Sequence, residues 1–219
     1  MSALIRATIA EMIGTFAMVF AGCGAIVVQA QTGALGHVGV CLTFGLVITA
    51  MIFATGHLSG AHFNPSVTLA FASLGRISWR SVPPYIASQL LAALAAAALI
   101  RSTIGTEASL GATTHELAIG SAFALEVVLT FFLMFVITAV ATDGRIKGSH
   151  AAIPIGATVA LCALMGGPLT GASMNPARSL GPAIVSGTLQ GQWLYVVAPI
   201  VGALLGAFSY QAIRGPGAG

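Results

Sequence analysis

The sequence predicts an all-α membrane protein with six transmembrane helices and two re-entrant half-helices, arranged as an inverted repeat of three plus three spans. Three observations predict this fold: a shortage of charge, six long apolar stretches, and the recurrence of the same motifs in both halves. Of the 219 residues, 57% are hydrophobic and only 6% are charged, whereas soluble domains carry about 25% charged residues. This small number of polar side chains cannot cover the core of a soluble protein. Most of the surface must therefore face lipid.

The apolar stretches define the individual elements. A helix that crosses a bilayer needs about 20 predominantly apolar residues. Six stretches qualify, at about 4–29, 36–56, 82–101, 119–141, 150–166 and 193–213. Two further apolar pieces, 64–74 and 175–185, are too short to cross and each begins with Asn-Pro. We interpret these two as half-helices that enter the membrane and stop.

The two halves of the chain repeat each other. Glu11 is followed by Thr-Phe four residues later, and Glu126 is followed by the same pair at the same spacing. The segment 60–65, Gly-Ala-His-Phe-Asn-Pro, recurs at 171–176 as Gly-Ala-Ser-Met-Asn-Pro. We therefore interpret residues 1–219 as one domain with halves at about 1–110 and 115–219. Because each half has three spans, the halves point in opposite directions, and their functional site is expected near mid-membrane.

The few charges indicate membrane orientation rather than a nucleic-acid surface. With both termini on one side, that side receives Arg6, Arg76, Arg80, Arg145, Lys147 and Arg214, against Arg101 on the other. This bias predicts cytoplasmic termini. A net charge of +3 is too small and dispersed to predict nucleic-acid binding. The first apolar run is too long for a cleaved leader.

The three cysteines, Cys23, Cys41 and Cys162, lie inside apolar runs without metal-binding or disulfide spacing. We expect them to be buried thiols that pack as small apolar side chains. No metal, cofactor or activated nucleophile is predicted.

Asn-Pro at the head of a short helix has a direct physical meaning. An Asn N-cap accepts a backbone N–H from the first turn with its side-chain oxygen, and Pro suits the first helical position. The amide NH₂ of Asn64 and of Asn175 is then left aimed beyond the helix. Two such helices meeting head to head would turn both positive dipole ends toward one point. That arrangement would exclude cations and interrupt a proton wire while it lets water pass.

The segments around Asn64-Pro65-Ser66 and Asn175-Pro176-Ala177, together with the repeated Glu-Thr-Phe pattern, resemble the signatures of the aquaporins, or major intrinsic proteins, over essentially the whole chain. The resemblance implies a passive channel for water and small uncharged solutes, a homotetramer, and a multi-pass protein of the cell (inner) membrane. Ser66 stands where the family usually has Ala, which we expect to be a mild change.

The resemblance also implies a narrow constriction formed by Phe44, Ala163, Ala172 and Arg178. Water-selective members carry His at the position of Ala163, and glycerol facilitators carry Asp directly after the Arg, where this chain has Ser179. With two alanines in the wall, the pore is expected to be wider than that of a strict water channel. Segments such as Gly56-His57 and Trp79-Arg80 resemble the plant nodulin-like branch, which passes glycerol, urea and neutral boric, silicic and arsenious acids.

Three buried polar residues are interpreted as braces for the re-entrant loops. Glu11 and Glu126 occupy equivalent repeat positions, so each is expected to accept backbone N–H bonds from one loop. The alternative is a pair of proton-relay carboxylates. His62 lies beside the first Asn-Pro motif and is interpreted as a hydrogen-bonded brace.

Four other functions remain open from the residues. A strictly water-selective channel would keep the same fold. A secondary transporter also uses inverted repeats and broken helices, but needs a coupling-ion site that this sequence does not indicate. A structural junction protein would have an occluded pore. An intramembrane enzyme is the weakest alternative, because no nucleophile–base pair is evident.

Overall fold

The computed structural model describes residues 1–142 and 151–215, and the described part consists of helices joined by turns and loops, without a strand. Six helices are long and apolar enough to cross a membrane: α1 (Ala3–Thr32), α2 (Gly36–Ser59), α4 (Val82–Thr103), α5 (Ile119–Thr142), α6 (Ala152–Thr170) and α8 (Leu194–Ile213). The predicted all-α membrane fold is therefore confirmed. Arg145 and Lys147, which were expected to help set the orientation in the membrane, lie outside the described residues.

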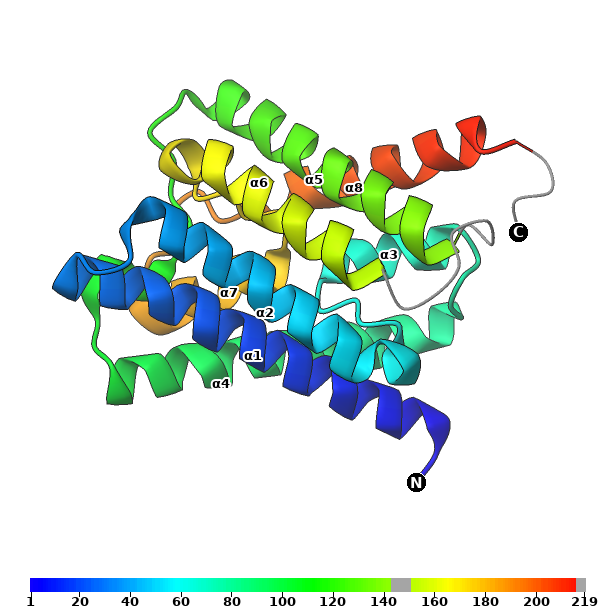
Figure 1. Cartoon of the computed structure of the whole chain (residues 1–219), viewed down its shortest axis with the longest axis horizontal. Coiled ribbons are helices and arrows are strands. Elements are labelled where there is room, and N and C mark those ends of the chain that lie inside the picture. Colours follow the sequence, from blue (N-terminus) through cyan, green and yellow to red (C-terminus); the bar gives the residue numbers. More distant parts are fainter. Residues whose placement is uncertain (143–150, 216–219) are drawn as a thin grey trace.

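Two short helices complete the bundle, α3 (Pro65–Ser73) and α7 (Pro176–Ser186). They enter from opposite ends of the molecule and meet in its middle, α3 from the end that holds both termini (Figure 1). Each half-helix packs against the last long helix of the other half, α3 against α8 and α7 against α4. Two 3₁₀ turns, η1 (Trp79–Ser81) and η2 (Glu107–Gly111), lie in the connections.

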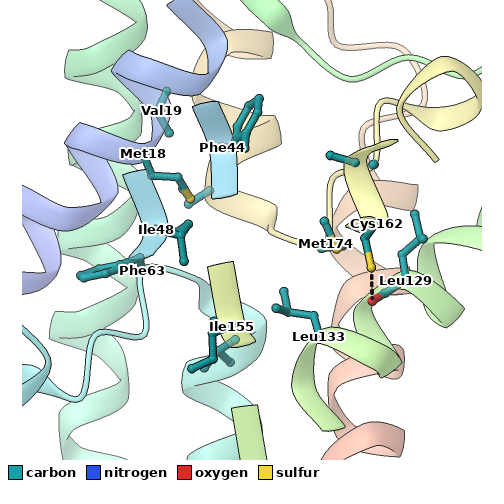
Figure 2. Packing of buried hydrophobic residues seen from close by; sticks show 14 of the residues in the cluster. Met18, Val19, Phe44, Ile48, Phe63, Leu129, Leu133, Ile155, Cys162 and Met174 are labelled. Atoms are coloured by element: carbon teal, nitrogen blue, oxygen red, sulfur yellow. Dashed lines mark hydrogen bonds between the residues drawn. The ribbon is translucent and has the colours of Figure 1, made fainter. Parts of the chain in front are cut away.

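The long helices form two groups that face each other across the half-helices. In the first half, α1 packs on α2 and α4; in the second half, α5 packs on α8 and α6; and α2 contacts α6 between the halves. Figure 2 shows the side chains between them, with Phe44 and Ile48 from α2, Leu133 from α5 and Ile155 from α6. This apolar cluster surrounds the place where the half-helices meet.

Three spans run three or four residues past their expected ends, α1 to Thr32, α2 to Ser59 and α6 to Thr170. The fifth span was expected to end at residue 166, before Gly-Pro, yet α6 continues through Pro168 to Thr170. A proline inside a helix removes one N–H and leaves the carbonyl four residues earlier without its helical partner. That carbonyl, Leu164 O, accepts instead from His37 Nε2 at 2.9 Å. This bond satisfies the carbonyl that the proline leaves without a helical donor.

Candidate functional site

The heads of the two half-helices are built by the same local chemistry. Asn64 and Asn175 have extended backbones and cap α3 and α7, with Pro at the first helical position. Asn64 Oδ1 accepts from Ser66 N at 2.9 Å. Asn175 Oδ1 accepts from Ala177 N at 3.0 Å and from Arg178 N at 3.3 Å. Both side-chain oxygens are thus occupied by their own helices.

The amide nitrogens join the two loops to each other. Asn64 Nδ2 donates to Met174 O at 2.7 Å, and Asn175 Nδ2 donates to Phe63 O at 2.9 Å. Each NH₂ thus extends beyond its own helix, and one of its two hydrogens bonds the opposite loop. An unmatched loop carbonyl at this depth would be costly, and the opposite Asn satisfies it. The second hydrogen of Asn64 Nδ2 remains for the cavity that both residues line, whereas Asn175 Nδ2 also donates to Met18 Sδ at 3.6 Å, a weak acceptor that lines the same cavity.

Glu11, fully buried in α1, holds the first re-entrant loop. Its Oε1 accepts from His62 N at 2.8 Å and from Ser59 Oγ at 2.7 Å, and its Oε2 accepts from Phe63 N at 2.6 Å. The loop needs such support because Ala61 and Phe63 both have φ of 51°. Left-handed backbone costs about 1–2 kcal/mol per non-glycine residue.

Glu126, fully buried in α5, holds the second loop in the same way. Its Oε1 accepts from Thr170 Oγ1 at 2.7 Å and from Ser173 N at 2.9 Å, and its Oε2 accepts from Met174 N at 3.0 Å. Ala172 and Met174 repeat the left-handed backbone of the first loop. The equivalent bonds at both loops give the two carboxylates one structural geometry.

His62 belongs to a second layer of bonds that the sequence only partly indicated. Its Nδ1 lies 3.1 Å from Thr68 Oγ1, and its ring packs between Phe71 and Tyr85. Gln89 Nε2 donates both to Thr68 Oγ1 at 3.0 Å and to Glu11 Oε2 at 2.9 Å. Sequence reasoning missed Gln89, although a lone amide in an alanine-rich span was a visible signal.

The equivalent layer in the second half uses hydroxyls. Ser173 Oγ and Ser179 Oγ are 2.5 Å apart, and Thr113 Oγ1 donates to Ser179 Oγ at 2.8 Å. Gln192 Nε2 in turn donates to Thr113 O at 2.8 Å. Sequence reasoning missed Thr113 and Gln192, because both lie in connections without a motif.

Two cavities open from opposite ends of the molecule toward the half-helix heads. The terminal-side cavity, on the side of the chain termini, has about 420 Å³ and contains both Asn side chains. The distal cavity, on the other side, has about 630 Å³. Four residues line both: Phe44, Ala163, Gly171 and Arg178. Ala172 lines the terminal-side cavity only. The cavities therefore adjoin at three of the four residues expected at the constriction.

Arg178 is the cation at this junction and is only 4% exposed. Its Nη1 donates to Gly111 O at 2.7 Å, and its guanidinium carbon lies 5.0 Å from the centre of the Phe44 ring. The carbonyl and the ring face both favour the charge. They fix the side chain while its other N–H groups remain available as donors.

The carbonyl that holds Arg178 sits on an unusual turn. Residues 108–110 in η2 are all left-handed and Gly111 continues with φ of 73°. Gln31 Nε2 ties this turn to α1 by donating to Ile104 O and to Glu107 Oε2, both at 2.8 Å. The pKa of the Glu107 carboxyl is lowered, chiefly by this bond from Gln31. Strained backbone of this kind persists only where surrounding bonds hold it.

The remaining sequence candidates have structural positions of their own. The three cysteines are free and buried. Within the described ranges, no three His, Cys, Asp or Glu side chains gather closely enough to hold a metal ion. Arg101 Nη1 donates to Val185 O at 2.8 Å near the C-terminal end of α7, where a cation complements the helix dipole.

Comparisons with known proteins agree with this architecture. The family described as Major intrinsic protein matches residues 1–210. Aquaporin NIP1-2 of Oryza sativa subsp. japonica is 47% identical over 214 residues, which cover 94% of this chain and 71% of the relative. Aquaporin NIP3-1 of Arabidopsis thaliana is 47% identical over 219 residues, covering 96% and 68%. The resemblance to the nodulin-like branch is therefore confirmed.

A solved structure shares the fold over almost its full length. The X-ray structure of the aquaglyceroporin from Plasmodium falciparum has a TM-score of 0.86 and 26% identity, with 96% of each chain covered. Members of the matched family are channels rather than enzymes. With six spans, two half-helices and adjoining cavities, this chain belongs to the major intrinsic protein family, the aquaporins, and is a membrane channel for water and small solutes.

Proposed function

We propose that this chain is a wide-pore aquaporin that passes water, glycerol, urea and neutral metalloid hydroxides such as boric, silicic or arsenious acid. One observation carries the proposal: Phe44 is the only bulky apolar side chain among the four constriction candidates, because positions 163 and 172 are alanines. Arg178 supplies hydrogen-bond donors opposite these small walls. The solved aquaglyceroporin with the same fold supports the passage of glycerol beside water.

The same geometry supports the exclusion of ions and protons. The positive ends of α3 and α7 both point at the place where Asn64 and Asn175 line the cavity. A cation there would face two helix N-termini and the Arg178 guanidinium. A water molecule would instead turn its oxygen toward the Asn donors, which interrupts a chain of proton-passing bonds.

The assembly and location proposed are those of the family resemblance: a homotetramer in the cell (inner) membrane with both termini in the cytoplasm. One pore would run through each subunit, because the two cavities adjoin within the helix bundle of this chain.

Stopped-flow light scattering on proteoliposomes tests the solute range. An osmotic step with sucrose should give fast shrinkage, and steps with glycerol, urea or boric acid should give fast shrinkage followed by fast reswelling. The Ala163→His variant should keep water flux within a few-fold and lower glycerol flux at least about 10-fold, because a second bulky wall costs about 1.4 kcal/mol or more in the barrier for the larger solute.

The other outcomes separate the alternatives. Shrinkage without reswelling in the unmodified protein would establish a strictly water-selective channel. Solute flux that saturates at low concentration and depends on an ion gradient would indicate a secondary transporter. Shrinkage no faster than in empty liposomes would contradict the proposed channel activity.

A further inference from the structure

One histidine of the distal cavity lies on the pore-lining face of α2. His37, Cys41 and Phe44 follow one another at helical spacings of four and three, and all three line the distal cavity. Residues at these spacings share one face of a helix. His37 is therefore about 10 Å, or two turns, from Phe44 along the axis. A solute that enters from the distal side passes this ring before it reaches the constriction.

The ring of His37 is held against α6 by a backbone carbonyl that has no hydrogen-bond donor within that helix. Pro168 has no N–H, so Leu164 O lacks its helical donor, and His37 Nε2 supplies the bond at 2.9 Å. Gly167 makes room for the ring, because a Cβ at this position would lie 2.8 Å from His37 Cε1. The imidazole is thus fixed across the cavity by two features of α6.

This bond determines what the other ring nitrogen offers. A carbonyl only accepts, so Nε2 must be the protonated nitrogen, and Nδ1 of the neutral ring is then an acceptor. The thiol of Cys41 does not occupy Nδ1 exclusively, since its Sγ is 3.7 Å from Nδ1 and 3.5 Å from Nε2. Thiols are weak hydrogen-bond donors.

An acceptor at this place complements the constriction. Arg178 only donates, and the side chains of Phe44, Ala163 and Ala172 offer no acceptor. A hydroxylated solute needs both, because each hydroxyl that loses its water partners without replacement raises the barrier.

We propose that His37 is a specificity-determining residue, an outer filter whose Nδ1 accepts a hydrogen bond from neutral hydroxylated solutes on their way to Arg178. The inference deepens the proposed function and rests on it.

Four variants in proteoliposomes test this role, with glycerol and water permeability measured on the same preparation. His37→Ala and His37→Phe should each lower the glycerol-to-water ratio about 2- to 10-fold, which is the effect of one net hydrogen bond. The Phe variant keeps the bulk and removes the acceptor. His37→Gln should restore most of the ratio, because its amide can both donate to Leu164 O and accept. Gly167→Ala should lower the ratio by displacing a ring that is still present.

His115→Ala is the matched control. This histidine also bonds a carbonyl, Leu117 O at 2.8 Å, but lines neither cavity. The glycerol-to-water ratio of the His115→Ala variant should therefore equal that of the unmodified protein. A higher ratio in His37→Ala with an unchanged ratio in His37→Phe would show a purely steric role and overturn the inference. Unchanged ratios in all His37 variants of a glycerol-conducting channel would overturn it as well. If the unmodified protein conducts water but no glycerol, the proposed solute range and this inference both fail.

Discussion

Two serines next to the Asn-Pro motifs have opposite hydrogen-bonding situations. Ser173 Oγ bonds Ser179 Oγ, Asn175 N and Asn175 O. Ser66 is fully buried at the start of α3, and its Oγ has no partner among the described residues. A buried hydroxyl without a partner costs about 1–3 kcal/mol. Ser66 and Ser173 are therefore expected to contribute differently to stability, although both are buried serines beside an Asn-Pro motif.

We predict that Ser66→Ala stabilises the protein by about 1 kcal/mol, because it removes an unmatched hydroxyl and leaves only a small void. Its thermal unfolding midpoint in detergent should rise by a few degrees. Water permeability should stay unchanged, because Ser66 lines neither cavity.

Ser173→Ala provides the comparison, since it removes a hydroxyl of similar burial that has three bonds. Its unfolding midpoint should fall by the equivalent of about 1–3 kcal/mol. Equal effects of the two substitutions would show that hydrogen bonding does not distinguish these positions.

At the scale of elements, small residues set how closely the helices approach. Gly202 and Gly206 of α8 form a GxxxG pair, and a Cβ there would lie 2.3 Å from Val127 O and 2.4 Å from Phe131 O. The motif therefore packs α8 onto the backbone of α5 within one chain. Such close approach is a common use of small residues in membrane helices.

The sequence predicted the type of every long helix and both half-helices, because these depend on local signals: apolar length, Asn caps and Pro at the first position. It placed the end of the fifth span too early, and it did not indicate that His37, far away in the chain, bonds the carbonyl left free by Pro168. The bond from Arg178 to Gly111 could not be predicted from the sequence either, since the strained turn in η2 carries no recognisable motif.

We predict that Gly206→Ala lowers the unfolding midpoint by the equivalent of about 1–3 kcal/mol, because the added methyl group forces α8 away from the α5 backbone. The measurement is thermal unfolding of the purified protein in detergent, followed by loss of helical circular dichroism.

Gly120→Ala is the control within α5, where a Cβ meets nothing within 4 Å. This substitution should leave stability unchanged or raise it by up to about 1 kcal/mol, because Ala favours helix. A midpoint for Gly206→Ala as high as that of the control would contradict tight α5–α8 packing.

For the whole molecule, the two halves share one pattern of bonds with different residues. Each Asn bonds the opposite loop, and each Glu holds its own loop, so neither loop is complete without the other half. The repeat of the motifs predicted that each Glu would bond one loop, but not that each Asn would bond the opposite loop. The partners Gln89 and Thr113 break the symmetry, because only the pore motifs need to match between halves.

The surface of the whole molecule also indicates how it sits in the membrane. Trp79 and Trp193 are 59% and 54% exposed and belong to connections at opposite ends. Exposed Trp is typical of both membrane–water interfaces. Among the described residues, four arginines belong to segments on the terminal side: Arg6, Arg76, Arg80 and Arg214. Arg101 lies in the last turn of α4, on the distal side.

We predict that the terminal side faces the cytoplasm, because positively charged residues are retained there. Single cysteines at two exposed positions test this, Ser2→Cys at the terminal side and Ser102→Cys at the distal side. A membrane-impermeant maleimide added to intact spheroplasts should label Ser102→Cys and spare Ser2→Cys, and inverted vesicles should give the reverse. The unmodified protein measures background, which includes any labelling of Cys41 through the distal cavity that it lines. Labelling of Ser2→Cys from outside would reverse the orientation, and the distal cavity with His37 would then face the cytoplasm.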